Sequence, residues 1–260
     1  MALKVTAIPA FEDNYLWLIH APTAPTQVVV VDPGDAGPVL RHLQSEQLTL
    51  CGMLATHHHA DHVGGVEALL AQFAVPLFGP ADEVIPGQPQ RVRQGQRAEF
   101  KALQLAFEVL EVPGHTAGHI AYVGHGAVFC GDTLFSAGCG RLFEGTATQM
   151  TASLQKLAAL PGTTAVYCGH EYTLSNLRFA QAVEPDNQSV REHFLRCTAL
   201  RQAGHATLPS SMAQELLINP FLRLKAQSVK QAAEAHAGRR LDSDTDVFAV
   251  LREWKNQFRG

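Results

Sequence analysis

The sequence has no long apolar run, few charged residues and no large excess of either charge. No stretch approaches the ~20 consecutive apolar residues that a membrane-spanning helix requires, so we expect no membrane partner. Residues 1–4 show no charged-then-apolar leader, and we expect a cytoplasmic protein. Because the formal net charge is −4, the sequence argues against general nucleic-acid binding, and we expect no nucleic-acid partner. We also expect a monomer.

Cysteine is scarce as well. The five residues are odd in number and show no C-x-x-C spacing, which argues against a disulfide framework or a cysteine-rich zinc site. A hydrophobic fraction of 46% with 17% charged residues is typical of a globular chain, so disorder is not indicated. The cysteines, which we expect to be mostly buried reduced thiols, are Cys51, Cys130, Cys139, Cys168 and Cys197.

What the sequence does contain is a histidine cluster. Residues 56–62 read Thr-His-His-His-Ala-Asp-His, with four imidazoles and one carboxylate in six consecutive positions. Neutral imidazole is the commonest protein ligand for zinc and iron, and a carboxylate adds charge without thiolate softness. The cluster therefore predicts a hydrolytic or redox metal site.

The flanking residues indicate where this cluster lies. Leu50–Ala55 is typical of a short buried strand, and Val63–Leu70 is typical of an amphipathic helix. On one helix the histidines would point in different directions, so we expect a strand-to-helix loop. In such a loop His57, His59 and Asp61 converge, while His62 turns the other way.

Three later segments each place one metal-binding residue after an apolar, strand-like run. They contain His115, Asp132 and His170, each preceded by glycine. The set exceeds what one tetrahedral ion needs, and two ions sharing a carboxylate at about 3.5–4 Å would use all of it. The candidate ligands are His57, His59, Asp61, His62, His115, Asp132 and His170.

Alternating strands and helices in the first part of the chain favour a layered α/β sandwich. The short runs between Pro76 and Gly131, beginning with Leu77-Phe78, predict a second sheet. After Tyr172 the pattern is helical. The predicted tail helices are Ser175–Val183, Asn187–Gln202, Ala226–His236 and Thr245–Phe258.

The order T-H-x-H-x-D-H, then a later His, an Asp and a final His, resembles the metallo-β-lactamase superfamily. Within it, the sequence is similar to glyoxalase II, the hydroxyacylglutathione hydrolases. The resemblance implies a metallo-β-lactamase αββα sandwich over 1–172 and a C-terminal all-helical, substrate-binding domain over 173–260. The similar segments are Phe11–Tyr15, Gly138–Arg141, Cys168–Tyr172 and Asn219–Arg223.

The resemblance also implies a ligand set. His57, His59 and His115 would hold one ion, Asp61, His62 and His170 the other, and Asp132 would bridge them. His58 and His119 would not be ligands. Because every donor is nitrogen or oxygen, we expect two divalent ions, zinc first, with iron or manganese as alternatives.

The implied reaction is hydrolysis of S-2-hydroxyacylglutathione thioesters, including S-lactoylglutathione to glutathione and D-lactate in methylglyoxal detoxification. Asp61 and Asp132 would be catalytic, together with a hydroxide between the metals, since two ions lower the pKa of bound water towards about 7. A thiolate with a thiol pKa of about 8.5 leaves largely unaided, so a thioester suits such a site.

A glutathione thioester carries carboxylates, so its cleft needs cations. We expect Arg141, Arg223 and Lys225 to bind the substrate, with Tyr172 donating a phenolic hydrogen bond. We also expect Phe143 to line the substrate site. It stands where the family commonly has a tyrosine that contacts the glutathione moiety, which leaves the details of the glutathione contact open.

Three other functions share parts of this pattern. A mononuclear iron persulfide dioxygenase would use only the counterparts of His57, His115 and Asp132, and generally lacks the helical tail. A β-lactam hydrolase often has cysteine at the position of Asp61. A non-catalytic scaffold of this fold usually loses ligands, whereas all are present here.

Overall fold

The computed structural model describes residues 3–259 and divides the chain into two compact units, each with its own core. The units interleave along the sequence. The predicted domains, 1–172 and 173–260, are instead continuous segments. The predicted boundary between residues 172 and 173 stays a prediction. The first unit comprises Met1–Glu111, Ala117–Gly131 and Tyr167–His170, and the second Val112–Thr116, Asp132–Val166 and Glu171–Gly260.

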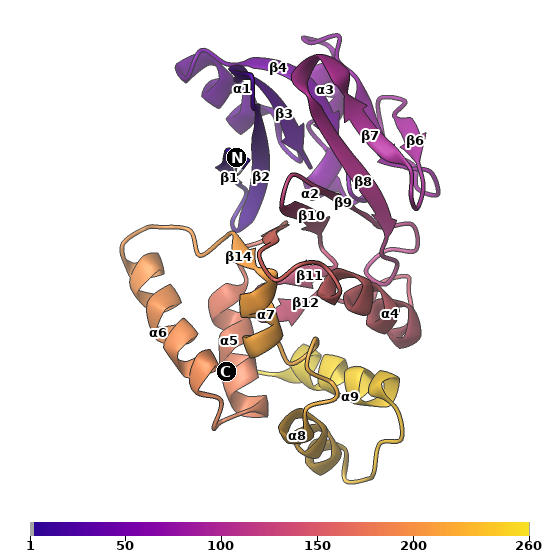
Figure 1. The fold of residues 1–260 in the computed structure, drawn as a ribbon, viewed down its shortest axis with the longest axis vertical. Coiled ribbons are helices and arrows are strands. Elements are labelled where there is room, and N and C mark those ends of the chain that lie inside the picture. The colour runs from indigo at the N-terminus through magenta and orange to yellow at the C-terminus, as the bar shows by residue number, and fades with distance from the viewer. Residues whose placement is uncertain (1–2, 260) are drawn as a thin grey trace. The chain divides into compact units, whose positions relative to one another are not determined.

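A mixed six-stranded sheet forms half of the first unit, in the order β1-β2-β3-β4-β5-β6 (Figure 1). The first three strands pair antiparallel through hairpins, and the last three add in parallel. The predicted place of Leu77-Phe78 in the second sheet is wrong, because β5 pairs with β4 here. A short apolar run reveals a strand but not its partner. The strands are Val5–Ala10, Asn14–Ala21, Ala24–Val31, Thr49–Leu54, Leu77–Pro80 and Gln90–Val92.

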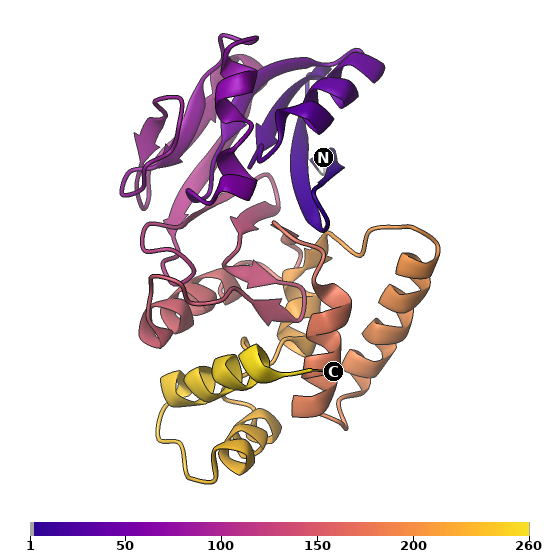
Figure 2. The same cartoon turned by 180° about the vertical axis from the view of Figure 1, so that it is seen from behind.

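Helices α1 (Ala36–Ser45) and α3 (Val66–Leu70) cover one face of this sheet, as Figure 2 shows. The Asp35 side chain caps α1 by accepting a hydrogen bond from the Gly37 amide at 2.8 Å. Pro38 lies in the first turn of α1, where proline is tolerated because the amides there lack intrahelical partners.

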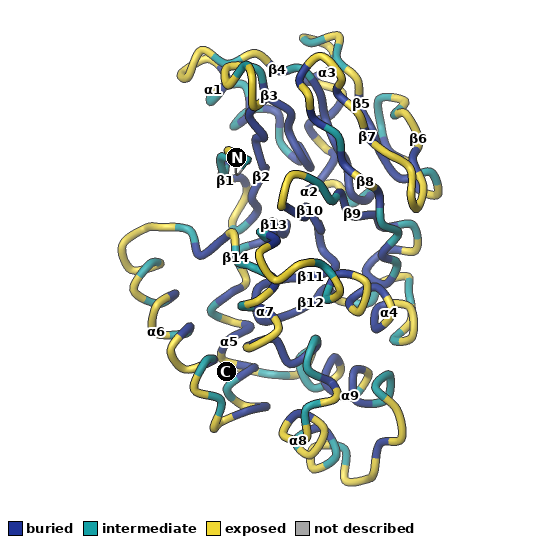
Figure 3. The backbone as a smooth tube through the Cα atoms, viewed as in Figure 1, coloured by how far each residue is buried: buried dark blue, intermediate teal, exposed yellow. Residues whose placement is uncertain are grey.

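A second sheet packs on the other face. It consists of antiparallel β7 to β10, followed in this unit by residues 167–168 of β13. The two sheets touch closely: a methyl group at Gly52 would lie 2.0 Å from the Phe100 ring. Figure 3 shows how completely the inner strands are buried. The bounds are Arg97–Phe100, Leu105–Glu111, Ile120–Gly124, Ala127–Gly131 and Ala165–Cys168, with the 3₁₀ turn η1 at Lys101–Leu103.

The second unit is mostly helical, and the four predicted tail helices are confirmed as α5, α6, α8 and α9. A short helix, α7, and a two-residue strand, β14, were not predicted. Both are too short to show a period, and β14 depends on pairing with Ala165–Val166. The elements are α4 Ala147–Ala158, β11 Leu134–Phe135, β12 Gly138–Cys139, α5 Thr173–Val183, α6 Gln188–Gln202, β14 Ser210–Ser211, α7 Met212–Ile218, α8 Gln227–Ala237 and α9 Asp244–Gln257.

The expected mixed α/β sheets followed by a helical tail are therefore confirmed. Among residues 3–259, no helix combines the length and apolar character needed to cross a bilayer.

Candidate metal centre

Three of the predicted ligands in the first unit converge on one point. Asp61 Oδ2 lies 3.4 Å from His62 Nε2 and 3.4 Å from His170 Nε2, and the two imidazole nitrogens are 3.4 Å apart. Ligands about 2.1 Å from a tetrahedral ion are separated by about 3.4 Å. The donor triangle therefore has the size that a tetrahedral ion requires, and the residues fit a metal.

The local structure of this stretch differs from the predicted loop. A one-turn helix, α2, spans Ala60–Val63, so Asp61 and His62 are helical residues. Helix α2 ends at Gly64 before α3 begins, and a side chain does not fit at Gly65, where a methyl group would lie 2.5 Å from the Ala36 amide nitrogen. The His62 side chain is buried, with 1% of the residue exposed.

The ring nitrogens opposite these donors also have suitable partners. His62 Nδ1 donates to Asp32 Oδ2 at 3.1 Å, and His170 Nδ1 donates to Asp13 Oδ1 at 2.8 Å. With the proton on Nδ1, each Nε2 offers its lone pair towards the donor triangle. Carboxylate partners of this kind orient metal-binding imidazoles and raise their basicity.

Asp61 is held as a carboxylate. Partial burial would raise its pKa, but the adjacent imidazoles of His170 and His62 and a hydrogen bond from Asn14 hold the pKa well below the usual range of an aspartic acid. The charged form, which is the form that binds a metal, is thus favoured.

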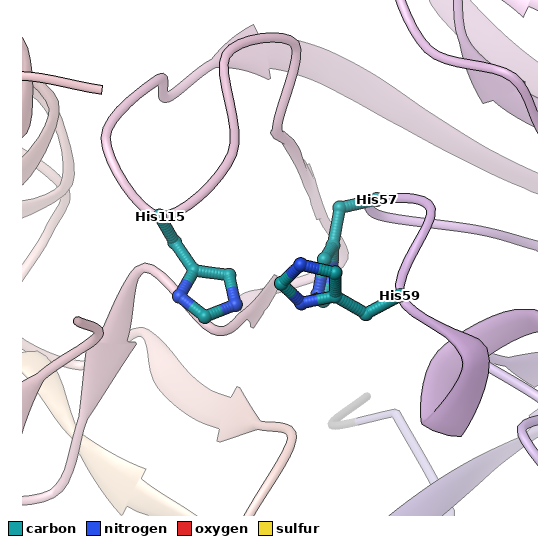
Figure 4. A group of neighbouring side chains, drawn as sticks. All are labelled: His57, His59 and His115. Carbon is teal, nitrogen blue, oxygen red and sulfur yellow. The ribbon is translucent and has the colours of Figure 1, made fainter. Parts of the chain in front are cut away.

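His57 and His59, both drawn in Figure 4, form a second group of donors, and their rings meet edge-on with centroids 4.8 Å apart. His57 Nε2 and His59 Nδ1 are 3.2 Å apart, and the opposite His57 nitrogen bonds the Thr56 hydroxyl at 3.1 Å. The predicted convergence of alternate residues is seen for this pair. His115, also drawn in Figure 4, belongs to the second unit.

The two histidines predicted to be non-ligands have other contacts. His58 Nδ1 bonds Glu83 Oε2 at 2.9 Å, and Glu83 also accepts a hydrogen bond from the Gly118 amide. The His119 ring stacks on the His57 ring at 4.5 Å and is fully buried. Both arrangements are consistent with supporting roles.

Asp32 is a site residue that the sequence analysis did not identify. Its carboxylate accepts hydrogen bonds from the Thr56 amide at 2.7 Å, the Thr56 hydroxyl at 2.8 Å and His62 Nδ1. With His57 and His62 it forms another cluster of metal-ligand type, but both of its oxygens are engaged. It therefore holds ligands in place. The sequence feature that could have identified Asp32 is its position directly after the apolar run Val28–Val31.

In the second unit His115 and Asp132 lie together. His115 Nε2 is 3.5 Å from Asp132 Oδ2, and its Nδ1 donates to the Arg141 carbonyl at 2.9 Å. The chain folds tightly here, since a methyl group at Gly140 would lie 1.9 Å from the Asp132 carbonyl oxygen. The Phe143 ring packs edge-on against the His115 ring at 5.2 Å.

A cavity of about 500 Å³ lies beside Arg141 and Phe143, and α9 forms its other wall. Arg252 of α9 is 6% exposed and donates to the Cys139 carbonyl at 2.8 Å. Lys255, one turn later, contacts the Ser175 carbonyl at 2.9 Å. Burial, together with the positive charges of Arg252, Arg141 and Arg178, lowers the pKa of Lys255 to about 8. The sequence analysis missed both α9 cations.

The predicted substrate-binding cations of the tail have different surroundings. Arg223 Nε and Nη2 bond the buried Glu184 carboxylate at 2.9 and 3.0 Å. Lys225 has a side chain that is 84% exposed and lies 3.9 Å from Asp244. The Tyr172 ring packs edge-on against Phe135. Substrate contact by Lys225 and Tyr172 stays a prediction. The ion pair with Glu184 leads us to expect a structural role for Arg223 instead of the predicted substrate contact.

Comparison with known proteins matches two successive parts of the chain to two family models. Residues 14–170 match a family model described as "Metallo-beta-lactamase superfamily", and residues 171–258 match one described as "Hydroxyacylglutathione hydrolase C-terminus". Among solved structures, ETHE1 from Myxococcus xanthus is similar, with a TM-score of 0.66 and 27% identity over 96% of this chain and 90% of that chain.

Curated relatives match over nearly their full length. A hydroxyacylglutathione hydrolase from Alkalilimnicola ehrlichii is 55% identical over 254 residues, which covers 98% of this chain and 99% of that protein. A hydroxyacylglutathione hydrolase from Nitrosomonas europaea is 48% identical over 258 residues, covering 99% and 97%. The match to a metallo-β-lactamase model and the His/Asp clusters together indicate divalent metal ions.

Proposed function

The chain belongs to the hydroxyacylglutathione hydrolase family of the metallo-β-lactamase superfamily, and from this premise we propose how its residues hydrolyse S-2-hydroxyacylglutathione thioesters. Water adds to the thioester carbonyl and the carbon–sulfur bond breaks, giving glutathione and a 2-hydroxy acid, which is D-lactate when the substrate is S-lactoylglutathione. The observation that carries this choice is the match of the whole helical tail, 171–258, to the hydrolase C-terminus. A persulfide dioxygenase, a β-lactam hydrolase and a scaffold do not explain that tail.

The proposed ligand assignment follows the two donor groups. Asp61, His62 and His170 hold one ion, and their mutual distances of 3.4 Å support it. His57, His59 and His115 hold the other, supported by ring protons directed at Thr56 and at the Arg141 carbonyl. Asp132 would be shared by both ions. When bound, the ions would supply Lewis acidity and a nucleophile at neutral pH, and we propose zinc, one of the divalent ions that nitrogen and oxygen donors accept.

The remaining chemistry belongs to the chain itself. The leaving glutathione thiolate has a conjugate thiol pKa of about 8.5, so the site needs no strong proton donor. Substrate binding does need cations, because glutathione carries two carboxylates. We propose that Arg141 and Arg252, which line the cavity of about 500 Å³, bind a glutathione carboxylate, with Lys255 adding positive charge. Residues 173–260 then form the substrate-binding domain.

A parallel assay tests the proposal. The full-length protein is loaded with zinc, its metal content is counted, and hydrolysis is followed for S-lactoylglutathione and for the lactoyl thioester of N-acetylcysteamine, which lacks the glutathione carboxylates. We expect two ions per chain and a kcat/KM at least about 100-fold higher for the glutathione thioester, from two charge-assisted contacts. Equal kcat/KM for both thioesters, or oxygen-dependent sulfite release from glutathione persulfide without thioester hydrolysis, would refute it.

The ionisation of Lys255 predicts that KM for the glutathione thioester depends on pH. With a pKa of about 8, its ammonium is charged at pH 7 and neutral above pH 9. KM for the glutathione thioester should therefore be flat between pH 6 and 7 and rise by up to about tenfold as the pH increases through 8, because the positive charge that Lys255 adds near the cavity is lost. The Lys255→Arg variant, which stays charged, should not show this rise. If its KM changes with pH as in the parent protein, another group is responsible.

A further inference from the structure

The turn between β1 and β2 lies against one of the two proposed ligand groups. Three residues, Phe11, Glu12 and Asp13, connect the paired positions Ala10 and Asn14. Phe11 has φ of 50°, in the left-handed region that bulky residues rarely adopt, although its side chain is 59% exposed. Because its side chain gains little burial, the other contacts of the turn must hold this conformation.

Asn14 fixes the position of Asp61. Its Nδ2 donates to Asp61 Oδ2 at 2.9 Å, the oxygen that forms the 3.4 Å triangle with His62 and His170. Asn14 also forms an isolated antiparallel bridge with His170, next to a 2.8 Å hydrogen bond from the Tyr15 amide to the Gly169 carbonyl. Its side chain is buried, with 5% of the residue exposed. One residue thus aligns two ligands that are more than a hundred positions apart in the chain.

Asp13 fixes the orientation of His170. Its Oδ1 accepts the Nδ1 proton of His170 at 2.8 Å, which leaves the Nε2 lone pair directed at the same triangle. An anionic acceptor raises the basicity of the imidazole more than a neutral one does. By comparison, His57 has the neutral Thr56 hydroxyl at its Nδ1.

We propose that Asp13 and Asn14 are positioning residues that set the affinity of the Asp61–His62–His170 group for its ion, separately from the His57–His59–His115 group. The inference rests on the proposed function, since it assumes that both groups hold a metal. The turn contacts the ligands Asp61 and His170, which belong to the first of these groups. Loss of its contacts should therefore release one ion and leave the other.

The test is a chelator titration of the zinc-loaded full chain, with retained metal counted by mass spectrometry. Asp13→Ala is the main variant, because its side chain is 38% exposed and its loss should not disturb the core. We expect it to release one ion at a 10- to 100-fold lower chelator concentration than the parent protein, while the second ion is released unchanged. Asn14→Ala should behave in the same way. Asp13→Asn keeps an acceptor oxygen but loses the charge. It should release its ion at a chelator concentration between those of the parent protein and Asp13→Ala.

Glu12→Gln provides the matched control, as an exposed carboxylate of the same turn. It should retain metal like the parent, and the melting temperature of metal-free Asp13→Ala should equal that of the metal-free parent. If Asp13→Ala keeps both ions at parent chelator concentrations, or loses both together, the inference is wrong. If the parent itself holds fewer than two ions, the failure lies in the proposed binuclear site instead.

Discussion

Replacing Asp132 with alanine is expected to lower kcat for S-lactoylglutathione about a thousandfold or more. Asp132 is 6% exposed and its Oδ2 lies 3.5 Å from His115 Nε2, and it is the carboxylate that the proposed assignment shares between both ions. Removing it should cost about 4 kcal/mol of transition-state stabilisation, together with at least one ion. Steady-state kinetics and metal counting on the purified variant measure both effects.

Two further variants serve as controls for the Asp132→Ala result. Asp82→Ala removes an exposed carboxylate that is paired with Arg93, and it should keep both ions and full turnover. Asp132→Asn retains the shape of the side chain but loses its charge, so it should separate packing from metal binding. An Asp132→Ala protein that keeps two ions and normal turnover would rule out the binuclear assignment.

Replacing Arg252 with alanine is expected to raise KM for the glutathione thioester by about tenfold or more, with kcat little changed. A charge-assisted contact to a remote carboxylate contributes about 1.5–3 kcal/mol and acts equally in ground and transition states. The lactoyl thioester without glutathione carboxylates should show almost no change. Because Arg252 is buried and bonds the Cys139 carbonyl, Arg141→Ala at the exposed rim of the cavity serves as a second variant.

Arg223→Ala is the matched arginine variant, and it should behave in the opposite way. Its guanidinium bonds Glu184, which is buried and whose pKa is lowered by Arg223, Ser228 and Asn187 against the raising effect of burial. Loss of Arg223 should therefore reduce the free energy of unfolding by on the order of 2 kcal/mol while KM stays near the parent value. A large KM increase for Arg223→Ala, with normal KM for Arg252→Ala, would return the substrate-binding role to Arg223.

Much of the fold was accessible from local pattern. The period-two strands and the 3.6-residue repeats of the tail predicted elements that the structure confirms. Partner choice was not accessible in this way, as Leu77-Phe78 shows, because a strand's sequence does not state which strand it will pair with. The short elements α2, α7 and β14 were missed for a related reason, since their existence depends on neighbours rather than on a repeat.

The sequence by itself determined the donor chemistry of the site: four histidines and an aspartate in 57–62, with His115, Asp132 and His170 following apolar strands. Only the tertiary structure decided which atom each donor offers. Asp32 lies 30 positions from His62, and Asp13 lies 157 positions from His170, yet these carboxylates fix the ring protons. The tertiary structure also decided which cations line the cavity. Arg223 was predicted to bind substrate because it ends the family-like segment Asn219–Arg223. Arg252 lies at the cavity because α9 packs against residues 139–143. Donor type is a property of one residue, but proton position and charge placement depend on contacts between distant residues.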